Sequence, residues 1–131
     1  MTDPAERTVR AFFDRVWNAG DDLAAEGLFA PGFRHHDLVT HGEADLAGFL
    51  HSIQWIRGLF VTLDFQVLDA VVQDGRVATR WRAEGRHGAT GKRVGIDGMS
   101  FDHVRDGRIV EDWTVWDRVG LREQLPEEFA S

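Results

Sequence analysis

The sequence contains no cysteine and no tyrosine among its 131 residues. Without cysteine, the chain can form no disulfide, no zinc–thiolate site and no thiol nucleophile. Without tyrosine, acid–base chemistry falls to the side chains of aspartate, glutamate and histidine. We therefore expect any acid–base site to use carboxyl and imidazole groups.

The chain also lacks an excess of positive charge, a long apolar run and a leader-like N-terminus. Its 15 lysines and arginines against 22 aspartates and glutamates give a net charge of −7, which argues against a nucleic acid or an anionic membrane as partner. No apolar run approaches membrane length, and residues 1–9 do not place a basic segment before an apolar one. We therefore expect a soluble cytoplasmic protein.

What is present indicates one folded domain over residues 1–131. The hydrophobic fraction is 43% and the aromatic fraction is 11%, enough for a sizeable core. Helical spacing and capping signals predict helices over residues 4–18, 23–29 and 43–57, with one more helical turn over 121–125. Alternating residues predict strands over 33–39, 61–72, 76–85, 94–104 and 108–117. Helices followed by a meander of antiparallel strands predict an α+β fold.

The last predicted hairpin turns at Asp106-Gly107 and has two possible registers. A two-residue loop would place Met99 on a mixed face with Asp112 and Thr114. A three-residue loop would instead place Met99 on an apolar face with Trp113 and Asp117. Because the second register separates apolar from polar residues more cleanly, we predict the three-residue loop.

This register gives Asp117 a candidate chemical role. A carboxylate on an apolar inner face has its pKa raised by desolvation, and Asp97, diagonally near, acts in the same direction. A raised pKa makes a carboxylate a better proton acceptor near neutral pH. The alternative is that the strand has ended and Asp117 caps the helical turn that follows.

The segment DGRIVEDWTVWDRVGLREQL resembles the C-terminal motif of the SnoaL-like polyketide cyclases, within the nuclear-transport-factor-2-like superfamily. FFDRVWNAGD, FRHHD and GRHGATGKRV agree with the family in the same order, so the resemblance covers nearly the whole chain. It implies a cone-shaped fold, in which a curved antiparallel sheet wraps around the N-terminal helices and encloses a deep pocket. It also implies an intramolecular aldol ring closure of a polyketide-like or other hydrophobic carbonyl substrate, without metal or cofactor.

The resemblance assigns residues to this chemistry. It implies that Asp117 is the general acid/base and that His36 is its partner, with His35 as the alternative because only one of two adjacent strand residues faces inward. The expected substrate-binding residues are Phe13, Trp17, Phe33, Met99, Trp113 and Asp97.

Two other functions stay open at this stage. An epoxide hydrolase related to the limonene-epoxide type would use Asp117 with Arg82 and Glu84, and a non-catalytic module would bind small ligands or dimerise. A metal at HHD is disfavoured, because His36 cannot join His35 and Asp37 on one face. We expect a hydrophobic small molecule as partner, and a homodimer formed through the exposed sheet face.

Overall fold

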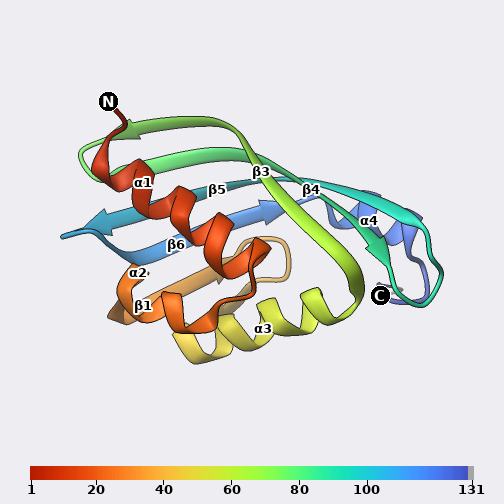
Figure 1. The fold of residues 1–131 in the computed structure, drawn as a ribbon. Coiled ribbons are helices and arrows are strands. Elements are labelled where there is room, and N and C mark those ends of the chain that lie inside the picture. Colours follow the sequence, from red (N-terminus) through yellow and green to blue (C-terminus); the bar gives the residue numbers. More distant parts are fainter. Residues whose placement is uncertain (130–131) are drawn as a thin grey trace.

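The computed structural model describes residues 1–129, in which helices pack on the concave side of one curved sheet (Figure 1). Helix α1 (Pro4–Ala11) continues directly into the π-helical segment η1 (Phe12–Asn18). The short η2 (Asp22–Ala24) and α2 (Ala25–Leu28) follow, then α3 (Leu46–Gly58) and α4 (Arg118–Gln124). In this part of the chain no helix is both long and apolar enough to cross a membrane.

The sheet has six strands in the order β2-β1-β6-β5-β4-β3. Their bounds are β1 (Phe29–Asp37), β2 (Gly42–Ala44), β3 (Phe60–Gln73), β4 (Arg76–His87), β5 (Arg93–Arg105) and β6 (Arg108–Trp116). The α+β prediction is confirmed. The sheet is mixed rather than wholly antiparallel, because β1 pairs with β6 in parallel.

The first helix begins and ends where the sequence predicts. The Asp3 side chain accepts a hydrogen bond from the Ala5 backbone N–H at 2.8 Å, and Pro4 occupies the first turn. Gly20 follows the helical segment with φ of 68°, a conformation that glycine adopts without strain. The Asn18 carboxamide then bonds both the N–H (2.7 Å) and the carbonyl (3.0 Å) of Phe65, which ties this end of η1 to β3.

The predicted loop of the last hairpin is wrong. Asp106 and Gly107, with φ of 52° and 77°, form a two-residue turn, so that Arg105 lies opposite Arg108. A β-bulge follows at once: His103 pairs with Glu111 while Val104 pairs with Ile109, which leaves Val110 as the extra residue.

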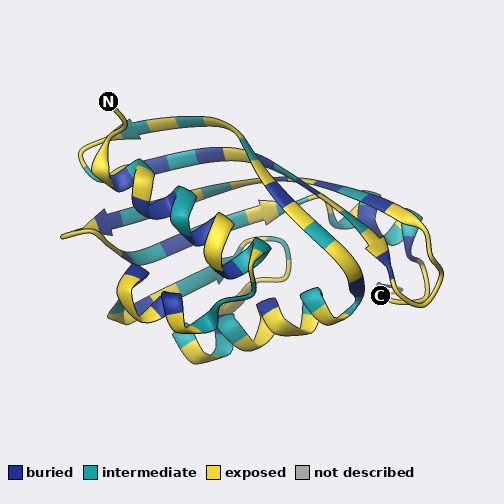
Figure 2. Cartoon of the chain, viewed as in Figure 1, coloured by how far each residue is buried: buried dark blue, intermediate teal, exposed yellow. Residues whose placement is uncertain are grey.

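The apolar face of this hairpin does not point inward. Met99 and Phe101 pair with Val115 and Trp113, as the common face requires, but this face lies outside, with Met99 52% and Phe101 41% exposed. Along β5, buried residues alternate with more exposed ones (Figure 2). The inner face carries polar side chains because it borders a cavity and not a closely packed helix. The predicted homodimer stays a prediction, for which this outer face is the surface to test.

Candidate active site

A cavity of about 290 Å³ lies between the concave face of the sheet, the segment α1–η1 and helix α3. Its wall is largely apolar and includes the aromatic residues Phe12, Phe13, Trp17, Phe49, Phe60, Phe65, Trp81, Trp116 and Phe129. Concave sites with apolar walls and few polar groups are typical small-molecule sites. The π-helical segment contributes to this wall, because both Phe12 and Phe13 are turned toward the interior and nearly fully buried.

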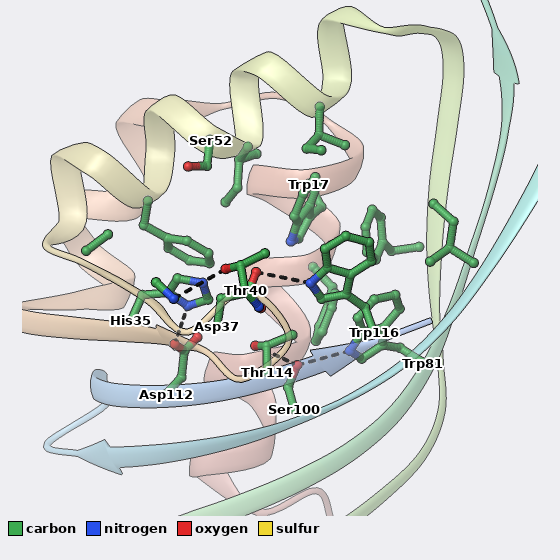
Figure 3. A pocket seen from close by; sticks show the side chains of 18 of the residues that line it. Trp17, His35, Asp37, Thr40, Ser52, Trp81, Ser100, Asp112, Thr114 and Trp116 are labelled. Carbon is green, nitrogen blue, oxygen red and sulfur yellow. Dashed lines mark hydrogen bonds and ion pairs between the residues drawn. The ribbon is translucent and has the colours of Figure 1, made fainter. Parts of the chain in front are cut away.

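Three ionisable side chains form a row across the sheet on the cavity wall. His35 on β1 lies in register with Asp112 on β6, and Asp112 lies opposite Asp102 on β5. The Nδ1 atom of His35 is 2.7 Å from Oδ1 of Asp112 (Figure 3), and Asp112 and Asp102 are each only 2% exposed. The His35 ring stacks on Phe49 with ring centres 4.0 Å apart, which holds it in place.

Burial changes the protonation of the two carboxyl groups. It raises the pKa of Asp102 well above its usual range, and the negative charge of Asp112 opposite raises it further. Burial also raises the pKa of Asp112, but the hydrogen bond and charge of His35 oppose that rise. Asp112 therefore ionises first, beside His35, while Asp102 keeps its proton to higher pH. Oδ1 of Asp102 is buried and has no hydrogen-bond partner among the described residues.

A second polar row lies one step further along the same strands. Trp81 Nε1 donates to Ser100 Oγ at 3.0 Å, and Ser100 Oγ lies 3.2 Å from Thr114 Oγ1. In the same part of the wall, Trp116 Nε1 donates to Asp37 Oδ2 at 3.0 Å (Figure 3). Each of the two indole N–H groups thus has an acceptor on the cavity wall, Ser100 Oγ for Trp81 and Asp37 Oδ2 for Trp116.

Gly98 makes room for one of these indoles. It lies between Trp81 on β4 and Trp116 on β6 in the register of the sheet. A Cβ atom at Gly98 would lie 2.2 Å from Cζ2 of Trp81, closer than two such atoms can approach. The absence of a side chain at Gly98 therefore leaves room for the Trp81 indole.

The predicted inward orientation of Asp117 is wrong. Asp117 is exposed and forms the N-cap of α4, where its Oδ1 accepts a hydrogen bond from the Gly120 N–H at 2.9 Å. This is the alternative that the sequence analysis left open. The strand ends at Trp116, and capping satisfies backbone N–H groups of the new helix that would otherwise lack partners.

His35, and not His36, faces the cavity. His36 lies on the outer face, with its ring stacked on Trp113 and its nitrogens 2.6 Å from Glu111 and 3.1 Å from Glu43. The expectation that His36 and Trp113 lie in the pocket is therefore wrong, because both belong to the outward-facing set of their strands.

The other predicted substrate-binding residues divide into two groups. Phe13 and Trp17 lie in the cavity wall, where substrate binding remains a prediction. Met99 and Asp97 lie on the outer face, and Asp97 pairs there with Arg82 at 3.1 Å. Phe33 is 1% exposed and packs on other phenylalanine rings rather than lining the cavity.

The residue set expected for an epoxide hydrolase is not assembled in the cavity. Arg82 pairs with Glu84 and Asp97 on the outer face, and no arginine lines the cavity within the described part of the chain. Across residues 1–129, no cluster of three or more histidine and carboxylate side chains is placed to hold a metal ion. The cavity therefore offers imidazole, carboxyl and hydroxyl groups as its chemistry.

Sequence reasoning missed the cavity row Asp102, Asp112 and His35. A signal was present: Ser100 and Asp102 alternate on one strand, and Asp112 and Thr114 alternate on its neighbour. The predicted register places these residues on the polar face of the hairpin, and a polar strand face borders water far more often than an internal cavity.

The comparisons with known proteins agree with this architecture. A comparison with curated proteins finds no match. Among solved structures, IdmH from Streptomyces antibioticus, described as a candidate polyketide cyclase, has 29% identity and a TM-score of 0.85 over 95% of this chain and 99% of its own. A candidate polyketide cyclase from Acidithiobacillus ferrooxidans has 22% identity and a TM-score of 0.85 over 97% of both chains. AclR, a candidate hydroxylase from Streptomyces galilaeus, has 21% identity and a TM-score of 0.83 over 94% of this chain and 96% of its own.

The last two similarities show the fold alone, which is the cone predicted from the sequence. The family model described as SnoaL-like polyketide cyclase matches residues 7–125, nearly the whole length of the chain. With this match, the chain belongs to the SnoaL-like polyketide cyclase family.

Proposed function

We propose that this protein is a cyclase or isomerase-type enzyme that moves protons on a hydrophobic carbonyl compound bound in the cavity. The general acid/base is the His35–Asp112 pair. The observation that carries the proposal is this 2.7 Å imidazole–carboxyl contact on the wall of a largely apolar cavity. The similarity to IdmH supports a cyclase among the activities that this fold can host.

The pair has the geometry of an oriented base. When Asp112 accepts the Nδ1–H of His35, the second ring nitrogen, Nε2, presents its lone pair. Nε2 has no hydrogen bond to another described residue, and His35 lines the cavity. A buried carboxylate also stabilises the imidazolium that forms when His35 takes a proton.

The reaction that fits this pair is redox-neutral. His35 removes a proton from a carbon next to a carbonyl group, and the resulting enolate carbon attacks a second carbonyl of the same molecule. The new carbon–carbon bond turns that second carbonyl into an alkoxide, which takes the proton back from the imidazolium. Positioned acid–base catalysis contributes about 10²–10⁴-fold to a rate, and the aromatic walls add to it by holding the substrate folded.

Deuterium exchange tests the proposal without knowledge of the natural substrate. β-Tetralone, a bicyclic ketone with acidic α-hydrogens, is incubated with the protein in deuterated buffer, and proton loss is followed by NMR against a protein-free control. We expect the wild type to accelerate exchange, and His35→Gln and Asp112→Asn each to reduce the acceleration about 100-fold. Asp117→Asn is the matched control and is expected to exchange like the wild type.

Two outcomes would contradict the proposal. If the wild type binds β-tetralone without accelerating exchange, the non-catalytic binding module becomes the better description. If exchange survives in His35→Gln and Asp112→Asn but is lost in Asp117→Asn, the acid/base is Asp117 and the cavity row has another role.

A further inference from the structure

Asp102 is a buried polar residue of the cavity wall that has no part in the proposed acid–base pair. It is 2% exposed, it lines the cavity, and its Oδ1 atom has no partner among the described residues. A buried polar atom without a partner costs about 1–3 kcal/mol. Such a group in a native fold calls for an explanation, and a hydrogen-bond partner supplied by a bound ligand is one that fits a cavity wall.

From this placement we propose that Asp102 binds the carbonyl oxygen of the substrate by donating a hydrogen bond from its protonated carboxyl group. The ligand is then an uncharged ketone, ester or phenol rather than a carboxylate. This inference rests on the proposed function, since it assigns a second role within the same cavity.

The surroundings of Asp102 favour its protonated form. Asp112 faces it from β6, while His35, the neighbouring group that could offset a negative charge, hydrogen-bonds to Asp112 and not to Asp102. From β4, Val77 lies opposite Asp102 and brings no charge. Desolvation and this neighbouring carboxylate together raise the pKa of Asp102, and both favour the form whose carboxyl group donates a hydrogen bond.

The position in the row suits a carbonyl oxygen. His35 and Asp102 lie two strands apart with Asp112 between them, a span of about 10 Å between backbones at roughly 4.8 Å per strand. Because the side chains of His35 and Asp102 both line the cavity, the distance that a ligand must bridge between them is shorter than this backbone span. A ligand lying across Asp112 can thus place its carbonyl oxygen on Asp102 and its acidic carbon toward His35. A donor at that oxygen stabilises the charge that develops as the enolate forms.

The charge of the cavity wall selects the ligand class. The carboxyl groups of Asp37, Asp102 and Asp112 line it, whereas no lysine or arginine of the described chain does. A carboxylate ligand would meet like charges and no cation in an apolar setting, which is unfavourable. The oxygen of a ketone or a phenol would instead meet the protonated carboxyl group of Asp102 as a hydrogen-bond donor, and the rest of the ligand would contact aromatic side chains.

Infrared difference spectroscopy and ligand titration test the inference on the full-length protein. The variants are Asp102→Asn, which keeps a donor of the same shape, and Asp102→Leu, which removes it, with exposed Asp97→Asn as the matched control. The probes are β-tetralone, β-naphthol as an enol mimic, and β-naphthoate as the charged counterpart, each titrated by calorimetry.

At neutral pH we expect the wild type to show the carbonyl stretch of a protonated carboxyl group. This band should shift when β-tetralone binds, and it should be absent in Asp102→Asn. Asp102→Leu should bind β-tetralone at least 10-fold more weakly and lose at least 100-fold in the turnover rate for exchange. Asp102→Asn should stay within a few-fold of wild-type binding, and β-naphthoate should bind at least 10-fold more weakly than β-naphthol.

The inference is overturned if the band is missing, if β-tetralone leaves it unshifted, or if Asp102→Leu binds like the wild type. Equal binding of β-naphthoate and β-naphthol would overturn the ligand class. A shifted band without exchange in the wild type would support the role of Asp102 while contradicting the proposed catalysis. If the wild type accelerates exchange and Asp102→Leu does so equally well, the proposed catalysis is supported and the role of Asp102 is contradicted.

Discussion

Replacing Asp102 by asparagine should stabilise the protein, and the gain should grow with pH. In the unfolded chain an aspartate releases its proton near pH ~3.9, whereas burial and the charge of Asp112 hold the Asp102 proton to higher pH in the folded protein. Unfolding in that window therefore releases a proton, and the free energy of unfolding falls as pH rises. The asparagine variant has no proton to release there.

The size of the effect follows from the burial of the side chain. Each unit by which the folded protein raises a pKa corresponds to about 1.4 kcal/mol. The side chain is 2% exposed, so water does little to screen this term. We expect the variant and the wild type to be about equally stable near pH ~4, where both carry neutral side chains, and the variant to gain about 1–3 kcal/mol by pH ~8. In melting temperature this is about 4 °C for each kcal/mol in a chain of this length.

Urea unfolding at a series of pH values measures the difference between the two curves. Asp112 is present in both proteins, so the difference reports chiefly on Asp102, and exposed Glu127→Gln serves as the control for a carboxylate whose removal should not matter. A difference that does not change between pH ~4 and ~8, or a variant that is less stable than the wild type at pH ~8, would refute the argument.

Two further variants test other parts of the structure. Asp117→Ala should lower the free energy of unfolding by about 1 kcal/mol through loss of the α4 cap, which urea unfolding measures. The rate of β-tetralone exchange should stay at the wild-type value. Loss of exchange in a folded variant would contradict the assignment of Asp117 as a cap. Gly98→Ala should displace the Trp81 indole, whose Cζ2 would lie 2.2 Å from the new Cβ, so we expect a loss of about 1–3 kcal/mol and weaker β-tetralone binding by calorimetry. Unchanged binding and stability would show that the indole has room to move.

Much of the fold could be predicted from local signals. The Asp3 cap, Pro4 and Gly20 delimit the first helical segment, and the Asp74-Gly75 and Asp106-Gly107 turns set the two hairpins. Such signals act over a few residues and depend little on the rest of the molecule. The parallel pairing of β1 with β6 has no local signal, because it joins segments that are far apart in sequence.

The site was harder to predict, since it depends on which face of a strand meets the cavity. Apolar residues are usually inside, but here Met99 and Phe101 lie outside and Asp102 and Asp112 lie inside. The bulge at Val110 adds to the difficulty, because one extra residue reverses the alternation between Ile109 and Glu111. The family resemblance located the fold correctly but not the orientation of Asp117.

The parallel contact of β1 with β6 also has a consequence for folding kinetics. Strands β3 to β6 form a meander of neighbours in sequence, whereas His35 and Asp112 are 77 residues apart. Distant parallel pairings form slowly, because a long loop must close before any contact repays its entropy. The imidazole should therefore reach its carboxylate only in the last stage of folding, and the recovery of exchange activity during refolding should lag behind the recovery of β-sheet circular dichroism.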